Sequence, residues 1–288
     1  MTQIIPYLLL GASIILETAK NVFSNDFSKN VLKNETDIYK FNVFTYIGSF
    51  LALCFFEGKG YSLFTIITAF FFALAVWLNQ YFLLKALNCG SMAFTSFING
   101  TALIIPIIYG VSFLGDKIYL KQIIYLVMLI IGMALALNVK KEKLDLKWLA
   151  FSGGAMLFLG IVSILQFTHQ TSSKRHELVD FLRLAFLFAI IINLFGWLIK
   201  ERKVPSGYSI KSKAIPMALF SGIFMGLVHI INLYLSGVID KVIFYPVSNG
   251  GLIFITLIAA LIFFKERLKA IQWVGIIIGI IALSLIGV

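Results

Sequence analysis

A carboxylate inside the first apolar stretch of the chain is the residue with the clearest chemical consequence. Glu17 lies about 7 Å from the centre of the predicted helix 3–23, at a rise of about 1.5 Å per residue. If this apolar helix lies in a membrane, a carboxylate so close to its centre must pair with a cation, take up a proton or face water. Lys20, three residues later, offers a structural ion pair near the helix end. We favour a water-filled cavity, in which Glu17 attracts a cationic or zwitterionic ligand.

The histidines and cysteines give weaker signals. His229 lies mid-helix with Asn232 three residues later, and its unperturbed pKa near 6.5 suits proton transfer. The 3 histidines and 2 cysteines of the chain lack metal-ligand spacing, so no metal or other cofactor is predicted. We expect Cys54 and Cys89 to be packed in the core rather than joined in a disulfide. There is no P-loop, so ATP is not expected to act on this chain directly.

The composition is that of a polytopic membrane protein. Hydrophobic residues make up 60% of the 288 residues and charged residues 13%, with a mean hydropathy of +0.97. A soluble domain of this length needs far more polar surface. Apolar runs of about 18 residues or more span a bilayer as helices, because each helix satisfies its own backbone hydrogen bonds. We interpret the net charge of +11 as lysines at the membrane surface, and no nucleic-acid partner is predicted.

Ten membrane-spanning helices are predicted from the apolar runs. The predicted spans are 3–23, 39–57, 62–87, 92–114, 120–139, 148–170, 178–199, 214–235, 242–264 and 270–288. The most charged stretch, 140–147, separates the fifth from the sixth span. The chain therefore divides into a first half, 1–139, a charged linker, 140–147, and a second half, 148–288.

The two halves are related in sequence. Segment 94–135 matches segment 244–285 without a gap, at an offset of 150 positions. Asn99-Gly100 coincides with Asn249-Gly250, and Gln122 with Gln272. Polar coincidences carry the argument, because polar residues are scarce in this chain. Five spans per half is an odd number, so the second half would be inverted in the membrane. Inverted repeats with a site at their interface are common in secondary transporters.

This arrangement resembles the drug/metabolite transporter (DMT) superfamily, specifically its EamA-type members. The resemblance rests on ten helices in two halves, on an Asn-Gly in the fourth and ninth helices, and on an acidic-basic turn before the fifth and tenth. The usual Gly-Glu of that turn is replaced by Gly115-Asp116 and by Lys265-Glu266. The resemblance implies a substrate cavity lined by the first, third, fourth, sixth, eighth and ninth helices. It also implies that the fifth and tenth helices pack together, which Gly275 and Gly279 would permit.

Polar and aromatic residues on the implied cavity helices are the candidate ligands. Trp and Tyr faces around a carboxylate suit a cationic or zwitterionic ligand through charge pairing and cation–π contact. Trp77 and Tyr245 fit an interfacial girdle equally well. Asn99 and Asn249 fit helix packing, and Pro106 and Pro246 could bend their helices. The full set of candidate substrate-binding residues is Glu17, Trp77, Asn79, Tyr81, Asn99, Gln166, His229, Asn232, Tyr245, Ser248 and Asn249.

Membrane orientation receives conflicting indications. The resemblance implies that both termini lie in the cytoplasm. The linker lysines, the basic cluster 200–213 and the basic residues of 265–269 then fall on the opposite side. The positive-inside rule favours the reverse orientation, because cytoplasmic loops carry the excess of Lys and Arg.

The function predicted from the sequence is secondary-active or exchange transport of a small polar metabolite by alternating access. The substrate class is an amine, an amino acid or a related cation or zwitterion. The partners are this substrate, the lipid bilayer of a bacterial inner membrane, and a coupling proton or counter-substrate. The alternatives are a multidrug or lipid-linked-sugar carrier, an intramembrane enzyme using His229 and Glu17, and a non-transporting scaffold. We do not expect an enzyme.

Overall fold

Apolar runs separated by short polar connections become helices throughout the chain. In the computed structural model of the protein, the described residues are 4–113, 119–137, 145–202, 214–239, 241–263, 265 and 268–285, and no β-strand occurs among them. The helices are α1 (Ile4–Asn30), α2 (Glu35–Leu53), α3 (Leu63–Cys89), α4 (Met92–Gly100), α5 (Ile104–Phe113), α6 (Leu120–Leu137), α7 (Leu146–Thr171), α8 (Leu178–Glu201), α9 (Ala214–Leu235), α10 (Lys241–Phe263) and α11 (Ala270–Leu285), with 3₁₀ turns η1 (Thr101–Leu103) and η2 (Arg175–Glu177).

Polar residues in the connections cap the helices that follow. Asn34 begins α2 with a capping box, in which its side chain accepts from the Asp37 N–H at 3.1 Å. The Asp37 carboxylate accepts in return from the Asn34 N–H at 3.2 Å. Ser62, Ser91 and Asp145 accept backbone N–H groups at the starts of α3, α4 and α7. These caps satisfy donors that would otherwise have no partner at a helix end.

The predicted fourth span is not one continuous helix. It consists of α4, η1 and α5, and the 3₁₀ turn lies directly before the turn that contains Pro106. Proline lacks an N–H and its ring clashes with the carbonyl four residues earlier, here that of Ala102. The Thr101 hydroxyl donates to the Ile98 carbonyl at 2.6 Å and stabilises the break. The matching helix α10 contains Pro246 and is continuous, so the two prolines differ in effect.

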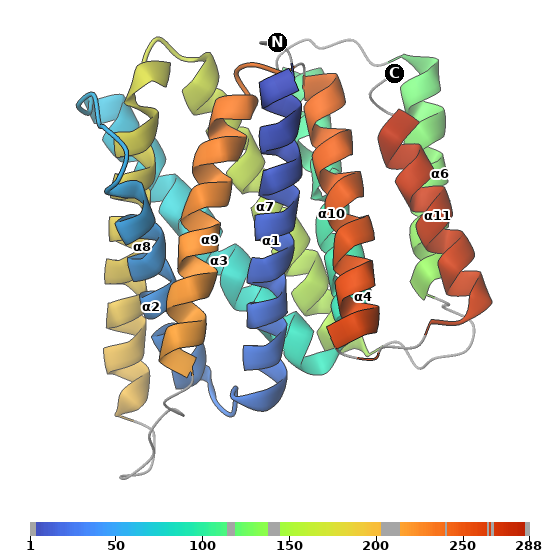
Figure 1. The fold of residues 1–288 in the computed structure, drawn as a ribbon, viewed down its shortest axis with the longest axis horizontal. Helices are drawn as coiled ribbons and strands as arrows, with labels where there is room; N and C mark the ends of the chain where they lie inside the picture. The colour runs from blue at the N-terminus through green and yellow to red at the C-terminus, as the bar shows by residue number, and fades with distance from the viewer. Residues whose placement is uncertain are drawn as a thin grey trace.

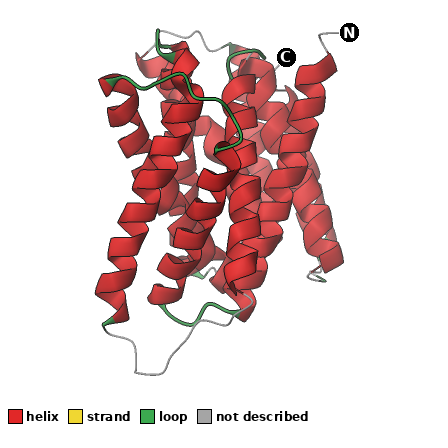
Figure 2. Ribbon diagram, turned by 60° about the vertical axis from the view of Figure 1, so that its left-hand side comes forward, coloured by secondary structure: helices red, strands yellow, loops and turns green. Residues whose placement is uncertain are grey.

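The helices run along one axis, and both termini lie at the same end of the bundle (Figure 1; Figure 2). We call this end the terminal end and the opposite end the basic end. From the terminal end α1 runs to the basic end, whereas α7 runs from the basic end to the terminal end. Of the charged linker 140–147, only residues 145–147 are among those described, and Asp116, Glu266 and Arg267 lie outside them.

Helices α6 and α11 pack against each other at the edge of the bundle (Figure 1). A Cβ atom on Gly132 would lie 2.8 Å from the Gly275 carbonyl oxygen and 2.8 Å from the Gly279 nitrogen. Glycine at position 132 is therefore required for this close approach to the backbone of α11. The expected pairing of the predicted fifth and tenth spans is confirmed.

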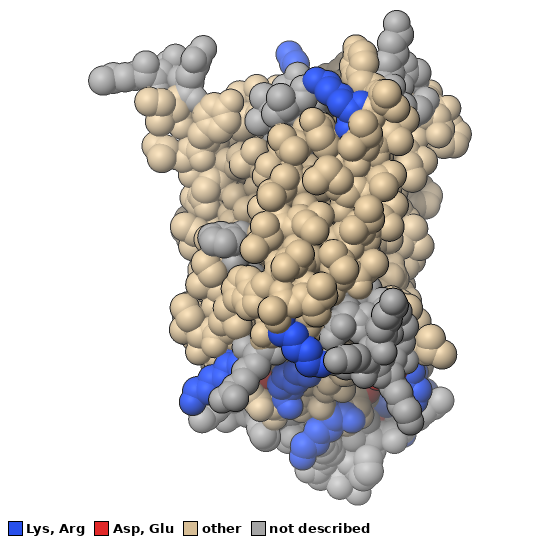
Figure 3. Space-filling model, turned by 90° about the vertical axis from the view of Figure 1, so that its right-hand side faces the viewer, with Lys and Arg blue, Asp and Glu red and all other residues tan. Residues whose placement is uncertain are grey.

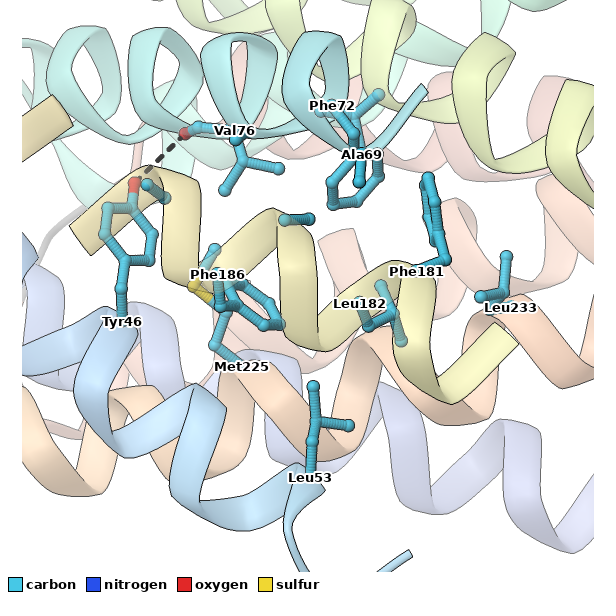
Figure 4. Close-up of a cluster of buried hydrophobic side chains, with 14 of the residues drawn as sticks. Tyr46, Leu53, Ala69, Phe72, Val76, Phe181, Leu182, Phe186, Met225 and Leu233 are labelled. Carbon is cyan, nitrogen blue, oxygen red and sulfur yellow. Dashed lines mark hydrogen bonds between the residues drawn. The ribbon is translucent and has the colours of Figure 1, made fainter. Parts of the chain in front are cut away.

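The largest apolar core lies where α2, α3, α8 and α9 meet. Figure 4 shows Phe181 of α8 beside Phe72 of α3, with 5.1 Å between the ring centroids. Leu182 and Phe186 of α8 lie on the side of Leu53 and Met225, and all of these side chains are at most 3% exposed. The Tyr46 hydroxyl donates to the Val76 carbonyl across the same core at 3.3 Å. This core joins two helices of the first half to two of the second half.

Most other contacts between the two halves have a counterpart in which each helix is replaced by the helix at the same place in the other half. Helix α2 packs on α9, and α3 packs on α8. Helix α3 also packs on α7, and α1 packs on α9. Helix α1 contacts α10, while α7 contacts α4, η1 and α5. Helices α2 and α8 contact each other, as do α4 and α10.

The outer surface is apolar, with basic residues concentrated at one end. Among the described residues, α3, α7, the segment 175–201 and α9 are long and apolar enough to cross a membrane. On the face drawn in Figure 3 a band of uncharged side chains lies between the two ends, and blue Lys and Arg side chains gather mainly at the lower, basic end. The described basic residues of that end include Lys29, Lys33, Lys85, Lys147, Lys200, Arg202 and Lys269. These features are those of a membrane protein.

The two cysteines contradict the expectation that they are core residues. Cys54 and Cys89 are both exposed, because each lies at the end of a helix facing outward. Cys54 follows α2 at the terminal end, and Cys89 ends α3 at the basic end. The natural thiols therefore report separately on the two sides of the membrane.

We predict that the basic end faces the cytoplasm, as the positive-inside rule requires. In intact cells, a membrane-impermeant maleimide should label Cys54, and it should label Cys89 only after permeabilisation. The single variants Cys54→Ser and Cys89→Ser assign each labelled band. Labelling of Cys89 in intact cells would instead support the orientation implied by the family resemblance.

Candidate functional site

A cavity lies between the two halves, at the meeting point of six elements. Its walls come from α1, α3 and η1 of the first half and from α7, α9 and α10 of the second. These elements correspond to the first, third, fourth, sixth, eighth and ninth predicted spans. The cavity volume is about 90 Å³. Pockets for drug-sized ligands usually exceed about 300 Å³, so the site in this conformation accommodates water or a very small solute.

Polar side chains reach the cavity from both halves. From the first half come Ser13, Glu17, Lys20 and Asn79. From the second half come Ser163, Gln166, His229, Asn232, Ser248 and Asn249. Apolar side chains, including Val76, Val162 and Met225, complete the wall. A concave site with a few convergent polar groups is the usual form of a small-molecule site.

The two charged groups at the cavity form an ion pair. The Lys20 ammonium donates to the Glu17 carboxylate at 2.5 Å, and the two side chains are 7% and 20% exposed. They lie three residues apart on α1, which places them on the same helix face. The structural pairing and the cavity position, considered above as alternatives for Glu17, therefore occur together. The site contains both charges and has no net charge from this pair.

Hydrogen bonds connect the polar groups of different helices around the cavity. The Ser13 hydroxyl on α1 donates to the Asn232 side-chain oxygen on α9 at 2.5 Å. The Gln166 side chain on α7 lies 3.1 Å from the His229 ring nitrogen Nδ1 on α9. The Asn79 side chain on α3 donates to the Ala155 carbonyl on α7 at 2.8 Å. The polar side chains are thereby held in place before any ligand binds.

The structure brings together most of the predicted substrate-binding residues. Those that line the cavity are Glu17, Asn79, Gln166, His229, Asn232, Ser248 and Asn249. Trp77, Tyr81 and Asn99 do not line it. The side chain of Tyr245 lies outside the described part of the chain. Lys20, Ser13 and Ser163 line the cavity although they were absent from the predicted set.

Trp77 and Tyr81 face a different part of the bundle because they lie on another face of α3. Together with Lys85 they form a stripe spaced by four residues that faces the start of α2. The Tyr81 hydroxyl donates to the Glu35 carboxylate at 3.0 Å, and the Trp77 ring packs near Tyr39 with 6.5 Å between centroids. Val76 and Asn79 lie on the face that reaches the cavity. Helical periodicity thus separates the aromatic pair from the site.

Glu35 links three helices at the basic end. Its carboxylate accepts from Lys200 on α8 and from Lys85 on α3, each at 2.6 Å. The Lys200 and Lys85 ammonium groups hold the pKa of Glu35 at about 2, below its ordinary value of 4.5. Lys40 similarly pairs with Glu201 at 2.6 Å. These contacts fasten α2 to α3 and α8 on the basic side of the cavity.

The terminal end is fastened by buried acidic groups at the start of α8. Glu177, 5% exposed, accepts from the Ser62 N–H at 2.8 Å and from the Thr65 hydroxyl at 2.5 Å. Asp180 accepts from the backbone N–H of Lys59 at 2.6 Å. Asp180 also forms an ion pair with Arg183 at 3.3 Å. The α2–α3 connection is thus held on α8.

No group of three His, Cys, Asp or Glu side chains within the described part of the chain converges on a metal-sized site. The candidate site offers hydrogen-bonding groups and an ion pair. Its chemistry is suited to binding a polar solute.

Comparison with known proteins identifies the architecture only. No protein-family model matches the chain, and no curated protein matches it. A solved structure described only as "Crystal structure of protein" superposes with a TM-score of 0.61 over 96% of this chain and 96% of that one, at 8% sequence identity. The fold is a known one. At so low an identity the similarity shows the fold alone.

Proposed function

We propose that this protein is a secondary-active or exchange transporter that moves a small polar metabolite through a bacterial inner membrane by alternating access. The observation that carries the proposal is the ion-paired polar cavity between the two halves of a predominantly apolar helical bundle. Polar and charged groups are costly at membrane depth unless they serve a pathway or a partner. The chain has no P-loop, so a gradient or a counter-substrate supplies the driving force.

The pattern of helix contacts supports ten crossings arranged as two inverted five-helix repeats. In the order of the chain, α1 corresponds to α7, α2 to α8, α3 to α9, α4–α5 to α10, and α6 to α11. Exchanging each helix with its counterpart converts the α2–α9 contact into α8–α3 and the α3–α7 contact into α9–α1, and both members of each pair occur. The contacts α6–α11, α2–α8 and α4–α10 convert into themselves. Such a relation is expected when two equivalent units rock about a central site.

The ion pair favours a zwitterion within the proposed substrate class. A simple cation would approach Glu17 against the repulsion of Lys20, which already occupies the carboxylate at 2.5 Å. A solute with both an ammonium and a carboxylate group can exchange partners with the pair and keep every charge compensated. Asn232, Gln166 and Ser248 supply neutral hydrogen-bonding groups around it.

The size of the cavity and the residues that line it bear on two of the alternative functions. A multidrug or lipid-linked-sugar carrier needs a wide cavity, and the volume of about 90 Å³ favours a smaller solute. An intramembrane enzyme would need a histidine and a carboxylate together, and His229 and Glu17 do share this cavity. Release of a lipid fragment without solute flux would support the enzyme.

The proposal is tested by ligand-dependent thermal stability of the purified protein. Amino acids, amines, quaternary ammonium compounds, nucleosides and sugar phosphates are added in turn to the wild type, to Glu17→Gln and to Asp26→Asn. Asp26 is the matched control, since it is a carboxylate on α1 that does not line the cavity. A ligand at about a hundredfold excess over its Kd stabilises the native state by about 2.7 kcal/mol.

We expect a zwitterionic class to raise the melting temperature of the wild type and of Asp26→Asn but not of Glu17→Gln. The stabilising solute is then tested for uptake into proteoliposomes with and without a pH gradient. Stabilisation by anions, or stabilisation that Glu17→Gln retains, would contradict the proposed substrate class. Binding without any flux would contradict transport.

A further inference from the structure

Helix α1 carries a continuous polar stripe that extends beyond the cavity. Ser13, Glu17 and Lys20 line the cavity, and Asn21, Ser24, Asn25 and Ser28 continue toward the basic end. Their spacing of three or four residues places them on one helix face. All four residues beyond the cavity are at most 5% exposed.

The polar atoms of this extension lack partners. Within the described residues, the Asn21 side-chain oxygen, both polar atoms of the Asn25 side chain and the Ser28 hydroxyl have no hydrogen-bond partner. The Gln80 side-chain oxygen of α3, beside the stripe, is also unpartnered, although its nitrogen donates weakly to Ser24 at 3.4 Å. Buried polar atoms without partners destabilise a protein and are rare in native structures. A state in which they meet water or a polar solute would remove this cost.

The opposite side of the cavity is different. Toward the terminal end the cavity is closed by an apolar cluster of Leu10, Leu235, Ile239 and Phe244. Toward the basic end the polar face of α1 continues, and two hydrogen bonds join the end of α1 to the end of α3. The Asn88 side chain of α3 donates to the Ser28 carbonyl at 2.5 Å, and the Lys29 ammonium donates to the Gly90 carbonyl at 2.7 Å.

We propose that Asn21, Ser24, Asn25 and Ser28 line the closed half of a solute path, which connects the cavity with the basic end and fills with water when that end opens. This inference rests on the proposed transport function and adds the route. The walls supply amide and hydroxyl groups and no charge, so a polar solute can pass without being trapped. The Asn88–Ser28 and Lys29–Gly90 contacts hold the path closed in this structure.

The test uses cysteine accessibility in protein reconstituted into nanodiscs, where both ends are open to solvent. In a Cys54→Ser/Cys89→Ser background, Ser24→Cys and Ser28→Cys each replace one oxygen atom by sulfur. The probe is a cationic, membrane-impermeant methanethiosulfonate. Ala218→Cys is the matched control, because Ala218 is also fully buried and packs in the apolar cluster that contains Phe27 of α1.

We expect Ser24→Cys and Ser28→Cys to react about tenfold faster than Ala218→Cys, because opening of the path exposes the first two positions and not the third. Ser28→Cys should react before Ser24→Cys, because it lies closer to the basic end. Adding Asn88→Ala should accelerate both reactions by removing a contact that closes the path. Rates equal to that of Ala218→Cys, or the reverse order, would overturn the proposal.

The melting temperature of a second variant tests the proposal even if the cysteine variants fold poorly. Ser28→Ala removes an unpartnered buried hydroxyl and should raise the melting temperature if the closed path is dry. A lower melting temperature would show a satisfied structural hydroxyl and contradict the path. If the cysteines react but no solute flux is found in proteoliposomes, the path is supported and the transport function is contradicted. If solute flux is found but the cysteines do not react, transport is supported and this route is contradicted.

Discussion

Gly222→Ala is expected to destabilise the protein by about 3 kcal/mol or more, a cost at the upper end of that for overpacked cores. A Cβ atom at Gly222 on α9 would lie 1.9 Å from the Thr45 carbonyl oxygen on α2, so a backbone atom would have to move. Two further glycines lie in the same contact between α2 and α9. A Cβ atom at Gly48 would lie 2.4 Å from a backbone oxygen of α9, and one at Gly226 would lie 2.7 Å from a backbone oxygen of α2. The Ser49 hydroxyl also donates to the Gly222 carbonyl at 2.8 Å.

Thermal unfolding in detergent measures this effect, with Gly153→Ala as the control. Nothing lies within 4 Å of a Cβ atom at Gly153, which is also mid-helix. Alanine there should be neutral or stabilising by up to about 1 kcal/mol, because it has the higher helix propensity. If Gly222→Ala melted within about 2 °C of the wild type, α2 and α9 would not be in backbone contact.

Separating the cavity ion pair is the second change with a large expected effect. Glu17→Gln and Lys20→Met each leave one charge without its partner in a site where the side chains are 20% and 7% exposed. Breaking a buried pair in this way costs about 3–5 kcal/mol, because the remaining charge is not compensated. The double variant Glu17→Gln/Lys20→Met removes both charges and should recover most of the lost stability.

A double-mutant cycle of melting temperatures measures the coupling between the two side chains. The same four proteins are compared for stabilisation by the ligand that the solute panel identifies. We expect the double variant to fold like the wild type and to show no ligand stabilisation. A double variant that binds the ligand normally would place the binding site away from Glu17 and Lys20, whatever its stability.

Helix positions and one ion pair could be predicted from local sequence. Among the described residues, each predicted span contains helix, because long apolar runs between capping residues leave few alternatives. The Glu17–Lys20 pair followed from a spacing of three residues. A bend was expected at Pro106, which cannot donate the hydrogen bond that a helix requires there, and the fourth span is interrupted just before it.

The direction in which each side chain points could not be predicted as well. Lipid-facing and buried residues are both apolar in this chain, so hydrophobic periodicity does not mark the inner face of a helix. Trp77 and Tyr81 were therefore assigned to the cavity although they face α2, and Cys54 and Cys89 were assigned to the core although they are exposed.

Two features did carry a sequence signal. Lys20 could have been placed at the cavity, because a partner three residues from Glu17 shares its helix face. Gly222 and Gly226 form a small-residue spacing of four that permits close helix contact. Their partner helix depends on tertiary packing and cannot be read from α9 alone.

The interruption at Thr101–Leu103 makes the two halves of the bundle unequal. The first half has a 3₁₀ turn beside the cavity, whereas α10 in the second half is continuous through the matching positions. When two repeats are identical, exchanging their conformations gives two states of equal free energy. Here the exchange is not symmetric, so the two end states differ in free energy. If the protein transports as proposed, it therefore rests mainly with one side open, and the forward and return steps of its cycle proceed at different rates.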